Sequence, residues 1–302
     1  MEKFSLVFSG RAVYHIAYVT VMKKVGDAMA NQNNPIGIID SGIGGFSVAR
    51  RVQKQLPHEN IIYFGDGANT PYGNHNAQDI LALTRYMLAF MRQRQIKALL
   101  VACNTISCLV DEYRREMDCP VLSVVQAGAE SVAQLPVKRV GVISTCFTAS
   151  TGCYPALIAQ LAPEKQVFSH GAKHLADLVE HGARQQAIDA ELKENLDGLV
   201  HRDQVDCCLL ACTHYPLVED NIRRLYPQLH LVDPAQRMAS ELERCLKETR
   251  QINRRSTPGT LELYTTADPQ EYIRAARRAG LEGVITAQAW PAMKLNKENE
   301  DA

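Results

Sequence analysis

The chain has 302 residues, enough for about two domains that each bury an apolar core. Its 33 Lys and Arg residues balance 33 Asp and Glu residues, which excludes the strongly basic surface typical of nucleic-acid-binding proteins. Nine cysteines are too few for a disulfide scaffold, and no apolar run reaches the roughly 18 residues of a membrane helix. We therefore expect a cytoplasmic protein, in a reducing compartment, with neither a membrane nor a nucleic acid as partner.

Residues 1–34 precede the first strong strand signal, and we expect them to form a flexible or helical extension. A start codon placed too early is one alternative. A secretory signal is another, but the semi-apolar patch at residues 13–22 is interrupted by His15 and Thr20 and no clear cleavage site follows it.

From Pro35 onward, short apolar runs alternate with longer amphipathic stretches. This alternation is typical of parallel sheets with crossover helices and predicts a doubly wound α/β fold. Seven runs are predicted as strands: residues 36–39, 61–64, 98–102, 121–125, 140–143, 207–211 and 229–232.

Two strand signatures occur twice along the chain. The run Ile36–Ser41 resembles Val140–Thr145 at an offset of 104 residues, and Leu100–Thr105 resembles Leu209–His214 at an offset of 109. Because both halves carry the same strand ends in the same order, we expect two α/β lobes related by a pseudo-twofold axis.

The repeat sets the predicted domain boundaries. Residues 35–130 form the first lobe and residues 131–240 the second, a C-terminal segment at 241–290 packs back on the lobes, and residues 291–302 form a solvated tail. Ligands of open α/β sheets bind beyond the carboxyl ends of the strands, where all the repeated motifs end. We therefore expect the active site in the cleft between the two pseudo-symmetric parallel-sheet lobes.

Two cysteines at these strand ends are candidate acid–base groups. Cys103 and Cys212 each precede a helical segment, and a helix N-terminus favours a thiolate. His214 can hold a proton near neutral pH. A zinc site is the competing interpretation, but the chain has no C-x-x-C pair, and Cys212 with His214 supplies only two ligands. The remaining cysteines are predicted to be small buried hydrophobes: Cys108, Cys119, Cys146, Cys153, Cys207, Cys208 and Cys245.

The segment Asp40–Gly45 looks at first like a phosphate-binding loop. Ser47 stands where the third glycine of G-x-G-x-x-G belongs, and no Gly-Lys-Ser/Thr follows, so a nucleotide role is disfavoured. A tight turn into a helix can instead present N–H groups to a carboxylate, with Asp40 left to meet a substrate ammonium or assist a proton transfer. That Asp40 or Ser41 merely caps the helix is equally open.

Four motifs together resemble the glutamate racemase family within the aspartate/glutamate racemase superfamily. They occur in family order over about residues 36–235: Asp40–Gly45, Pro71–Gly73, Ala102–Thr105 and Cys212–Leu217. Aspartate racemases typically carry Glu where His214 stands, which favours glutamate as substrate. Alone, residues 71–73 would be a turn, and Thr148 and Glu180 would be capping or surface residues.

The resemblance implies a cofactor-independent proton transfer at Cα that interconverts L- and D-glutamate for peptidoglycan synthesis. It implies that Cys103, with Asp40 as helper, acts on the D-isomer, and that Cys212, helped by His214 and Glu180, acts on the L-isomer. It also implies a homodimer, and it leaves open activation by a cell-wall precursor. The substrate-binding positions that it implies are Asp40, Ser41, Pro71, Tyr72, Gly73, Asn104, Thr105, Thr148, Thr213 and His214.

Three departures from the family pattern affect the fit of side chains more than the type of reaction. Ala211 replaces the usual Gly, Thr151 stands where Ser is common, and Asn69 and Thr70 precede Pro71 where Arg and an apolar residue are frequent.

Two alternative functions stay open. One alternative keeps the fold and both thiols but takes aspartate, hydantoin or another α-acid as substrate. The other is a non-catalytic protein that binds an amino acid or a protein partner, which the polar residues after both cysteines disfavour.

Overall fold

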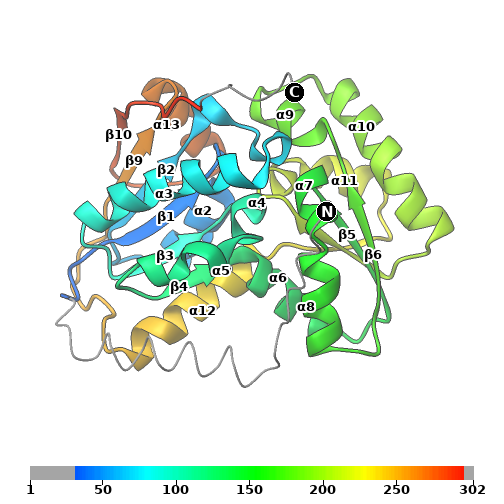
Figure 1. The fold of residues 1–302 in the computed structure, drawn as a ribbon, viewed down its shortest axis with the longest axis horizontal. Helices are drawn as coiled ribbons and strands as arrows, with labels where there is room; N and C mark the ends of the chain where they lie inside the picture. Colours follow the sequence, from blue (N-terminus) through cyan, green and yellow to red (C-terminus); the bar gives the residue numbers. More distant parts are fainter. Residues whose placement is uncertain (1–30, 296–302) are drawn as a thin grey trace.

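The computed structural model describes residues 31–295, so the predictions for residues 1–30 and 296–302 lie outside the described part. Residues 31–295 form two lobes, each built on a parallel sheet (Figure 1). The strand order is β10-β9-β2-β1-β3-β4 in the first sheet and β6-β5-β7-β8 in the second. The predicted α/β class with two parallel sheets is confirmed.

The strands differ from the predicted runs mainly at the sheet edges. The first sheet contains β1 (Ile36–Asp40), β2 (Ile61–Gly65), β3 (Ala98–Val101), β4 (Val121–Ser123), β9 (Leu261–Thr265) and β10 (Ile285–Ala289). The second contains β5 (Arg139–Ser144), β6 (Gln166–Gly171), β7 (Cys207–Ala211) and β8 (His230–Val232). Each predicted run overlaps a strand, but β6, β9 and β10 were not predicted. The edge strands β6 and β10 carry polar, partly exposed residues instead of a continuous apolar run.

The prediction of a strand to residue 125 was wrong. The side chain of Ser123 accepts a hydrogen bond from the N–H of Gln126 and caps a helix, so Val124 and Val125 are its first residues.

The α-helices of the described part are α2 (Phe46–Gln55), α3 (Ala77–Gln93), α4 (Asn104–Ser107), α5 (Val110–Tyr113), α6 (Val124–Ala133), α7 (Cys146–Thr151), α8 (Cys153–Leu161), α9 (Leu175–Glu180), α10 (Gln185–Asp197), α11 (Glu219–Leu225), α12 (Ala235–Glu248) and α13 (Pro269–Arg278).

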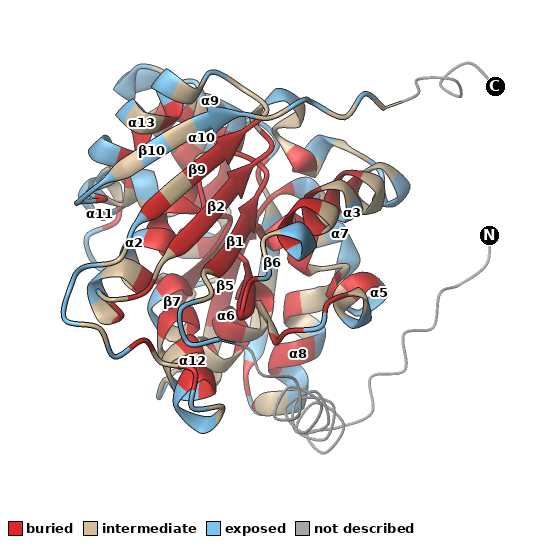
Figure 2. Ribbon diagram, turned by 90° about the vertical axis from the view of Figure 1, so that its left-hand side faces the viewer, coloured by how far each residue is buried: buried red, intermediate tan, exposed pale blue. Residues whose placement is uncertain are grey.

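Each sheet has an apolar core on both faces, as a doubly wound fold requires. In β1, Ile36 and Ile38 face the core shared with α2 and α12, whereas Ile39 faces the core shared with α3. In β7, Leu210 and Leu209 likewise face the two cores of the second sheet. Figure 2 shows the central strands as continuous buried ribbons. The rigid sheets therefore hold their strand ends in fixed positions.

The internal repeat is visible in the topology. The order β2-β1-β3-β4 in the first sheet reappears as β6-β5-β7-β8 in the second, each strand replaced by the one four places later. Asp40, at the end of β1, therefore corresponds to Ser144 at the end of β5. Cys103, after β3, corresponds to Cys212, after β7.

The chain crosses between the lobes twice. Helix α6 leads from β4 to β5, and α12 leads from β8 back to β9, which pairs with β2. Along α6, Val124 packs into a core of the first sheet and Val125 into a core of the second. We retain the predicted domain division as a proposal, with the strands of the C-terminal segment added to the first lobe.

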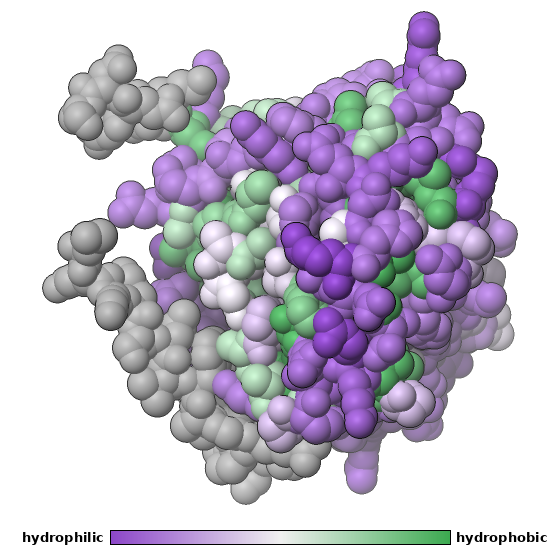
Figure 3. Space-filling model, turned by 90° about the vertical axis from the view of Figure 1, so that its right-hand side faces the viewer, coloured by the Kyte–Doolittle hydropathy of each residue, from purple (hydrophilic) through white to green (hydrophobic). Residues whose placement is uncertain are grey.

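The outer surface of the second lobe is mainly hydrophilic (Figure 3). Among residues 31–295, no helix combines the length and the apolar character that crossing a bilayer demands.

Candidate active site

The predicted cysteines lie at facing strand ends of the two lobes. Asp40 ends β1, Cys103 follows β3, and Cys212 follows β7. The hydroxyl of Thr213 donates a hydrogen bond to Oδ2 of Asp40 at 3.1 Å, which joins the second lobe to the first. Asp40 is completely buried and both cysteines are about 5% exposed. The strand ends therefore enclose a site that is shut off from water.

A hydrogen-bonded chain runs through the second lobe from Cys212. Its Sγ lies 3.6 Å from Nδ1 of His214, and Nε2 of His214 makes a very short contact with Oε2 of Glu180. The same carboxylate accepts a hydrogen bond from the N–H of Ile43 in the first lobe at 3.2 Å. Glu180, predicted only from the family resemblance, thus orients the imidazole beside the sulfur and also ties the two lobes together.

The charges along this chain are set by its pairing. Burial lowers the pKa of His214, but its hydrogen bonds to Cys212 and Glu180 outweigh burial and raise that pKa well above its ordinary value. Burial raises the pKa of Glu180, but the hydrogen bond to His214, the charge of His214 and the N–H of Ile43 together outweigh burial and lower that pKa. An imidazolium therefore faces the Glu180 carboxylate at neutral pH and lies beside the sulfur of Cys212.

The environment of Cys103, in contrast, favours the protonated thiol. Burial, followed by the charge of Asp40, raises the pKa of the Cys103 thiol to about 12. The thiol donates to the hydroxyl of Ser41, with 3.6 Å between sulfur and oxygen. Burial also raises the pKa of Asp40 to about 6. At neutral pH, Cys103 therefore carries a proton while Cys212 lies beside a cation, which is the arrangement of one acid and one base.

The glycine-rich segment uses two of its N–H groups for contacts within the protein. The N–H of Gly42 donates to Oδ1 of Asp40 at 3.0 Å, and the N–H of Ile43 donates to Glu180. These N–H groups therefore bind carboxylates of the protein itself. The alternative that Asp40 or Ser41 caps the next helix is wrong, because the N-cap of α2 is Gly45 and no side chain caps it.

Two glycines mark close approaches between the lobes. A Cβ at Gly44 would lie 2.5 Å from Oγ1 of Thr213 and 2.9 Å from the backbone nitrogen of His214. A Cβ at Gly73 would lie 2.6 Å from Cβ of Thr145. Glycine is therefore required at both positions by contact across the interface.

A second polar group surrounds Thr145. The hydroxyls of Thr105 and Thr145 are 3.1 Å apart, and Thr145 donates to Oγ1 of Thr148 at 3.1 Å. Sequence reasoning did not select Thr145, although the repeat aligns it with Ser41 at the offset of 104 residues and could have identified it.

Asn104 presents a buried donor that has no partner. Its Oδ1 accepts a hydrogen bond from the hydroxyl of Tyr154 at 2.5 Å, whereas its Nδ2 has none, although Asn104 is only 2% exposed. A buried amide donor without a partner is costly unless a bound molecule supplies an acceptor. The sequence around Tyr154 does not indicate that this residue belongs to the site.

The predicted Pro71–Gly73 turn lies at the rim of this region. Pro71 precedes a short 3₁₀ segment, Tyr72–Asn74. The hydroxyl of Tyr72 donates to Oδ2 of Asp66 at 2.6 Å, so it is bonded within the first lobe. Asp66, which sequence reasoning also missed, follows β2 directly and had only that position to suggest it.

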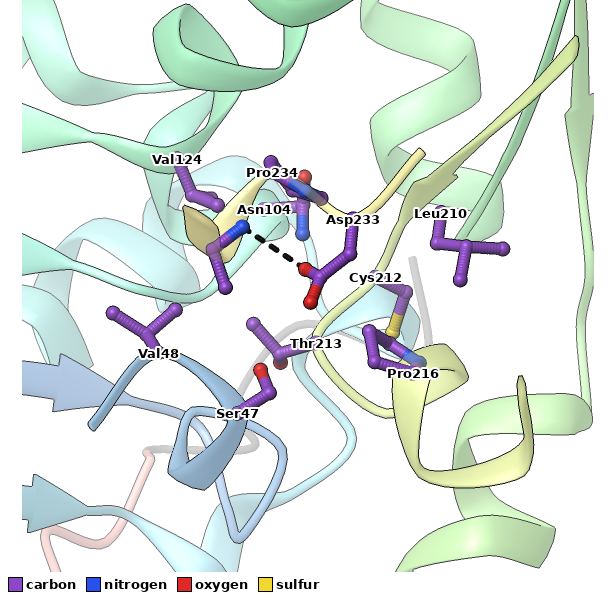
Figure 4. Close-up of a pocket in the computed structure, with 11 residues that line it drawn as sticks. Ser47, Val48, Asn104, Val124, Leu210, Cys212, Thr213, Pro216, Asp233 and Pro234 are labelled. Atoms are coloured by element: carbon purple, nitrogen blue, oxygen red, sulfur yellow. Dashed lines mark hydrogen bonds between the residues drawn. The ribbon is translucent and has the colours of Figure 1, made fainter. Parts of the chain in front are cut away.

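A pocket too narrow for a water molecule lies between the lobes beside Cys212 (Figure 4). Asn104 and α2 line it from the first lobe, and Thr213 from the second. Asp233 also lines it, with its carboxylate accepting from the N–H of Ala235 at 2.9 Å. Within residues 31–295, no three His, Cys, Asp or Glu side chains are grouped so as to hold a metal ion.

Comparison with known proteins agrees with this geometry. The Asp/Glu/Hydantoin racemase family matches residues 12–242 of the chain, and this range begins inside the N-terminal extension. A glutamate racemase from Streptococcus sanguinis (strain SK36) is 34% identical over 273 residues, 88% of this chain and 98% of the relative. The crystal structure of a glutamate racemase isoform from Bacillus anthracis has 29% identity and a TM-score of 0.80, covering 87% of this chain and 100% of that chain. A glutamate racemase from Francisella tularensis in complex with D-glutamate has 29% identity and a TM-score of 0.78, covering 86% and 97% of the two chains.

Proposed function

Because the chain belongs to the Asp/Glu/Hydantoin racemase family, we propose that it interconverts L- and D-glutamate by proton transfer between Cys103 and Cys212. The resemblance seen in the sequence motifs is confirmed, and the protein is an amino-acid racemase. Its role is to supply D-glutamate for peptidoglycan synthesis.

The observation that carries the proposed mechanism is the unequal environment of the two sulfurs. In the L-to-D direction, the sulfur of Cys212, paired with the His214 cation, removes the Cα proton. The thiol of Cys103 delivers a proton to the opposite face. In the reverse direction the roles exchange, and Asp40 assists the loss of the proton from Cys103.

Fixed donors supply the rest of the catalysis. An amino-acid Cα–H is a weak acid, so its removal needs donors that stabilise the developing carbanion in a site without water. The unpartnered Nδ2 of Asn104 and the hydroxyls of Thr105 and Thr148 are the proposed partners of the substrate carboxylates. Ser41, the Pro71–Gly73 turn, Thr213 and His214 complete the proposed binding set, and Asp40 is placed to meet the ammonium.

One incubation tests the proposed function against its alternatives. Protein freed of metal and pyridoxal phosphate is incubated with L-glutamate in heavy water, and optical rotation and Cα deuteration are followed. We expect the rotation to fall to zero while deuterium enters Cα. Reaction with aspartate but not with glutamate would overturn the substrate assignment. Inactivity toward every acid tested would favour a binding protein.

Three further features belong to the proposal. We place the activity in the cytoplasm, which is consistent with the absence of disulfides among the cysteines of residues 31–295. The family resemblance supports a homodimer, testable by sedimentation. It also raises activation by a cell-wall precursor, testable by adding that precursor to the assay.

Asp40→Asn is expected to stabilise the fold at neutral pH and to impair turnover. The pKa of Asp40 rises from 3.8 to about 6 on folding, so the folded state binds the extra proton and wild-type stability falls as pH rises through this window. The two pKa units correspond to about 3 kcal/mol. The amide oxygen of Asn can accept from the N–H of Gly42, and its Nδ2 can donate to the hydroxyl of Thr213, so both contacts remain without the charge. The variant therefore gains stability up to this amount above about pH 6 and almost none near pH 4.

Urea unfolding at both pH values measures this difference, and a racemisation assay measures the loss of turnover, about 10²-fold. Asp111→Asn, which removes a carboxylate that is 44% exposed, is the matched control and should change neither quantity. Equal stability of Asp40→Asn and wild type at neutral pH would contradict the prediction.

Gly44→Ala is expected to lower kcat/KM by about 10²-fold, because the new methyl group would push Thr213 and His214 away from their positions. Gly283→Ala is the control: its φ of +77° strains an alanine, but nothing lies within 4 Å of the added Cβ. We expect Gly283→Ala to lose stability and keep its activity. Wild-type kcat/KM in Gly44→Ala would show that the close approach is not required.

A further inference from the structure

A second pair of cysteines joins the lobes outside the acid–base pair. Sγ of Cys108, directly after α4 in the first lobe, lies 3.0 Å from Sγ of Cys153, the first residue of α8 in the second. Both are partly exposed. Both residues pack against an apolar core of the second sheet, so the prediction that they are small hydrophobes is confirmed in part, but neither is fully buried and each sulfur contacts the other.

The surroundings of the pair make its members chemically unequal. The hydrogen bond from Cys108, the Thr151 hydroxyl and the N–H of Tyr154 lower the pKa of Cys153, against the effect of burial. The contact with Cys153, followed by burial, raises the pKa of Cys108 well above its ordinary value. Cys153 is therefore the better nucleophile, and Cys108 is a thiol held within reach of it.

We propose that hydroperoxides oxidise Cys108 and Cys153 to a disulfide that joins the two lobes and stops turnover. In the first step the sulfur of Cys153 attacks one oxygen of hydrogen peroxide. An S–O bond forms, the O–O bond breaks, and the second oxygen leaves as water with the proton from the thiol.

In the second step the sulfur of Cys108 attacks the sulfur of the sulfenic acid at Cys153. An S–S bond forms, the S–O bond breaks, and the hydroxyl leaves as water with the proton of Cys108. The two thiols lose two electrons, and one peroxide becomes two waters. A thiol reductant reverses the reaction by exchange.

The cross-link acts on turnover through access to the site. Cys103 and Cys212 are about 5% exposed and Asn104 is 2% exposed, so glutamate reaches them only when the lobes separate. Cys108 lies one helical turn after Asn104, and Cys153 immediately precedes Tyr154, the partner of that asparagine. A covalent bond there holds the lobes together beside a proposed substrate-binding residue. This effect on activity rests on the proposed function, whereas formation of the bond does not.

The test treats the full chain with equimolar hydrogen peroxide and digests it without reduction. We expect mass spectrometry to find the Cys108 and Cys153 peptides joined with the loss of two hydrogens. We expect racemisation to fall at least tenfold and to return after a thiol reductant. Cys108→Ser and Cys153→Ser should start with wild-type activity and lack this reversible loss. Cys146→Ser, which removes an exposed cysteine, is the matched control and should behave like wild type.

Each outcome bears on the proposal separately from the racemase assignment. Absence of the joined peptides, in a protein whose Cys146 is oxidised under the same conditions, would overturn the disulfide. Joined peptides with full activity would overturn the effect on turnover, as would an equal reversible loss in Cys108→Ser and Cys153→Ser. A protein that never racemises glutamate but still forms the joined peptides would contradict the proposed function and leave the disulfide supported.

Discussion

Cys103→Ala and Cys212→Ala will each lower racemisation by at least about 10³-fold in both directions, because every turnover of the proposed mechanism needs one sulfur to remove a proton and the other to deliver one. The two variants will differ in proton exchange. In Cys212→Ala the remaining sulfur can remove the Cα proton of D-glutamate and return a solvent proton to the same face. Cys103→Ala will do the same for L-glutamate. Each variant should therefore label one enantiomer without inverting it.

Incubation of each enantiomer with each variant in heavy water measures this, with NMR for loss of the Cα proton and chiral chromatography for inversion. Cys207→Ala is the control, because that cysteine is completely buried in the core of the second sheet. It should lose stability and retain racemisation. Normal turnover in either active-site variant would refute the two-thiol mechanism, and labelling of the opposite enantiomers would reverse the assignment of faces.

Glu180→Gln will lower kcat/KM by about 10²-fold. Glutamine keeps an acceptor for the N–H of Ile43 but carries no charge, so His214 loses the carboxylate that helps to hold its proton. The pKa of His214 will fall, and the sulfur of Cys212 will lose its neighbouring cation at lower pH than in wild type. The alkaline limb of the pH–rate profile should therefore move to lower pH.

The loss must be equal in both directions, because two enantiomers are equally stable in water and their equilibrium constant is one. The direction-specific role of Cys212 appears instead in isotope effects. The effect measured with α-deuterated L-glutamate should increase, whereas that with α-deuterated D-glutamate should decrease, since in the proposed mechanism Cys212 removes the proton only from the L-isomer. Asp189→Asn, which breaks a partly exposed ion pair with Arg224, is the control and should leave the rate and its pH profile unchanged. Equal isotope effects for both enantiomers would contradict this role.

The parts of the fold that the sequence predicts are those encoded by continuous apolar runs. Strand β1 is buried along its whole length, and its apolar run reveals it without any tertiary information. Strand β10 could not be found this way, because only its pairing with β9 makes Ile285–Ala289 a strand. The end of β4 depended on a single side chain, since Ser123 caps α6 and converts the two following valines to helix.

The same distinction applies to the candidate site, where local sequence motifs reveal some residues and only tertiary contacts reveal others. Cys212 and His214 are two residues apart, so a local motif contains their interaction. Glu180 contacts His214 from another helix, and only the family resemblance identified it. The internal repeat could have identified Thr145 from the sequence. It could not have identified Tyr154, because the role of Tyr154 arises from the contact of α8 with α4 across the interface.

The two crossings through α6 and α12 limit how this enzyme can move. Two bodies joined at one point can turn about any axis, but two bodies joined at two points can turn only about the line through both. Of the rotations between the lobes, the two crossings therefore restrict least the one about the line that joins α6 and α12. Because Cys103 and Cys212 are buried between the lobes, both enantiomers of glutamate must enter and leave where the lobes part. A substrate and its mirror image thus share one path, and in the proposed mechanism the two sulfurs distinguish them.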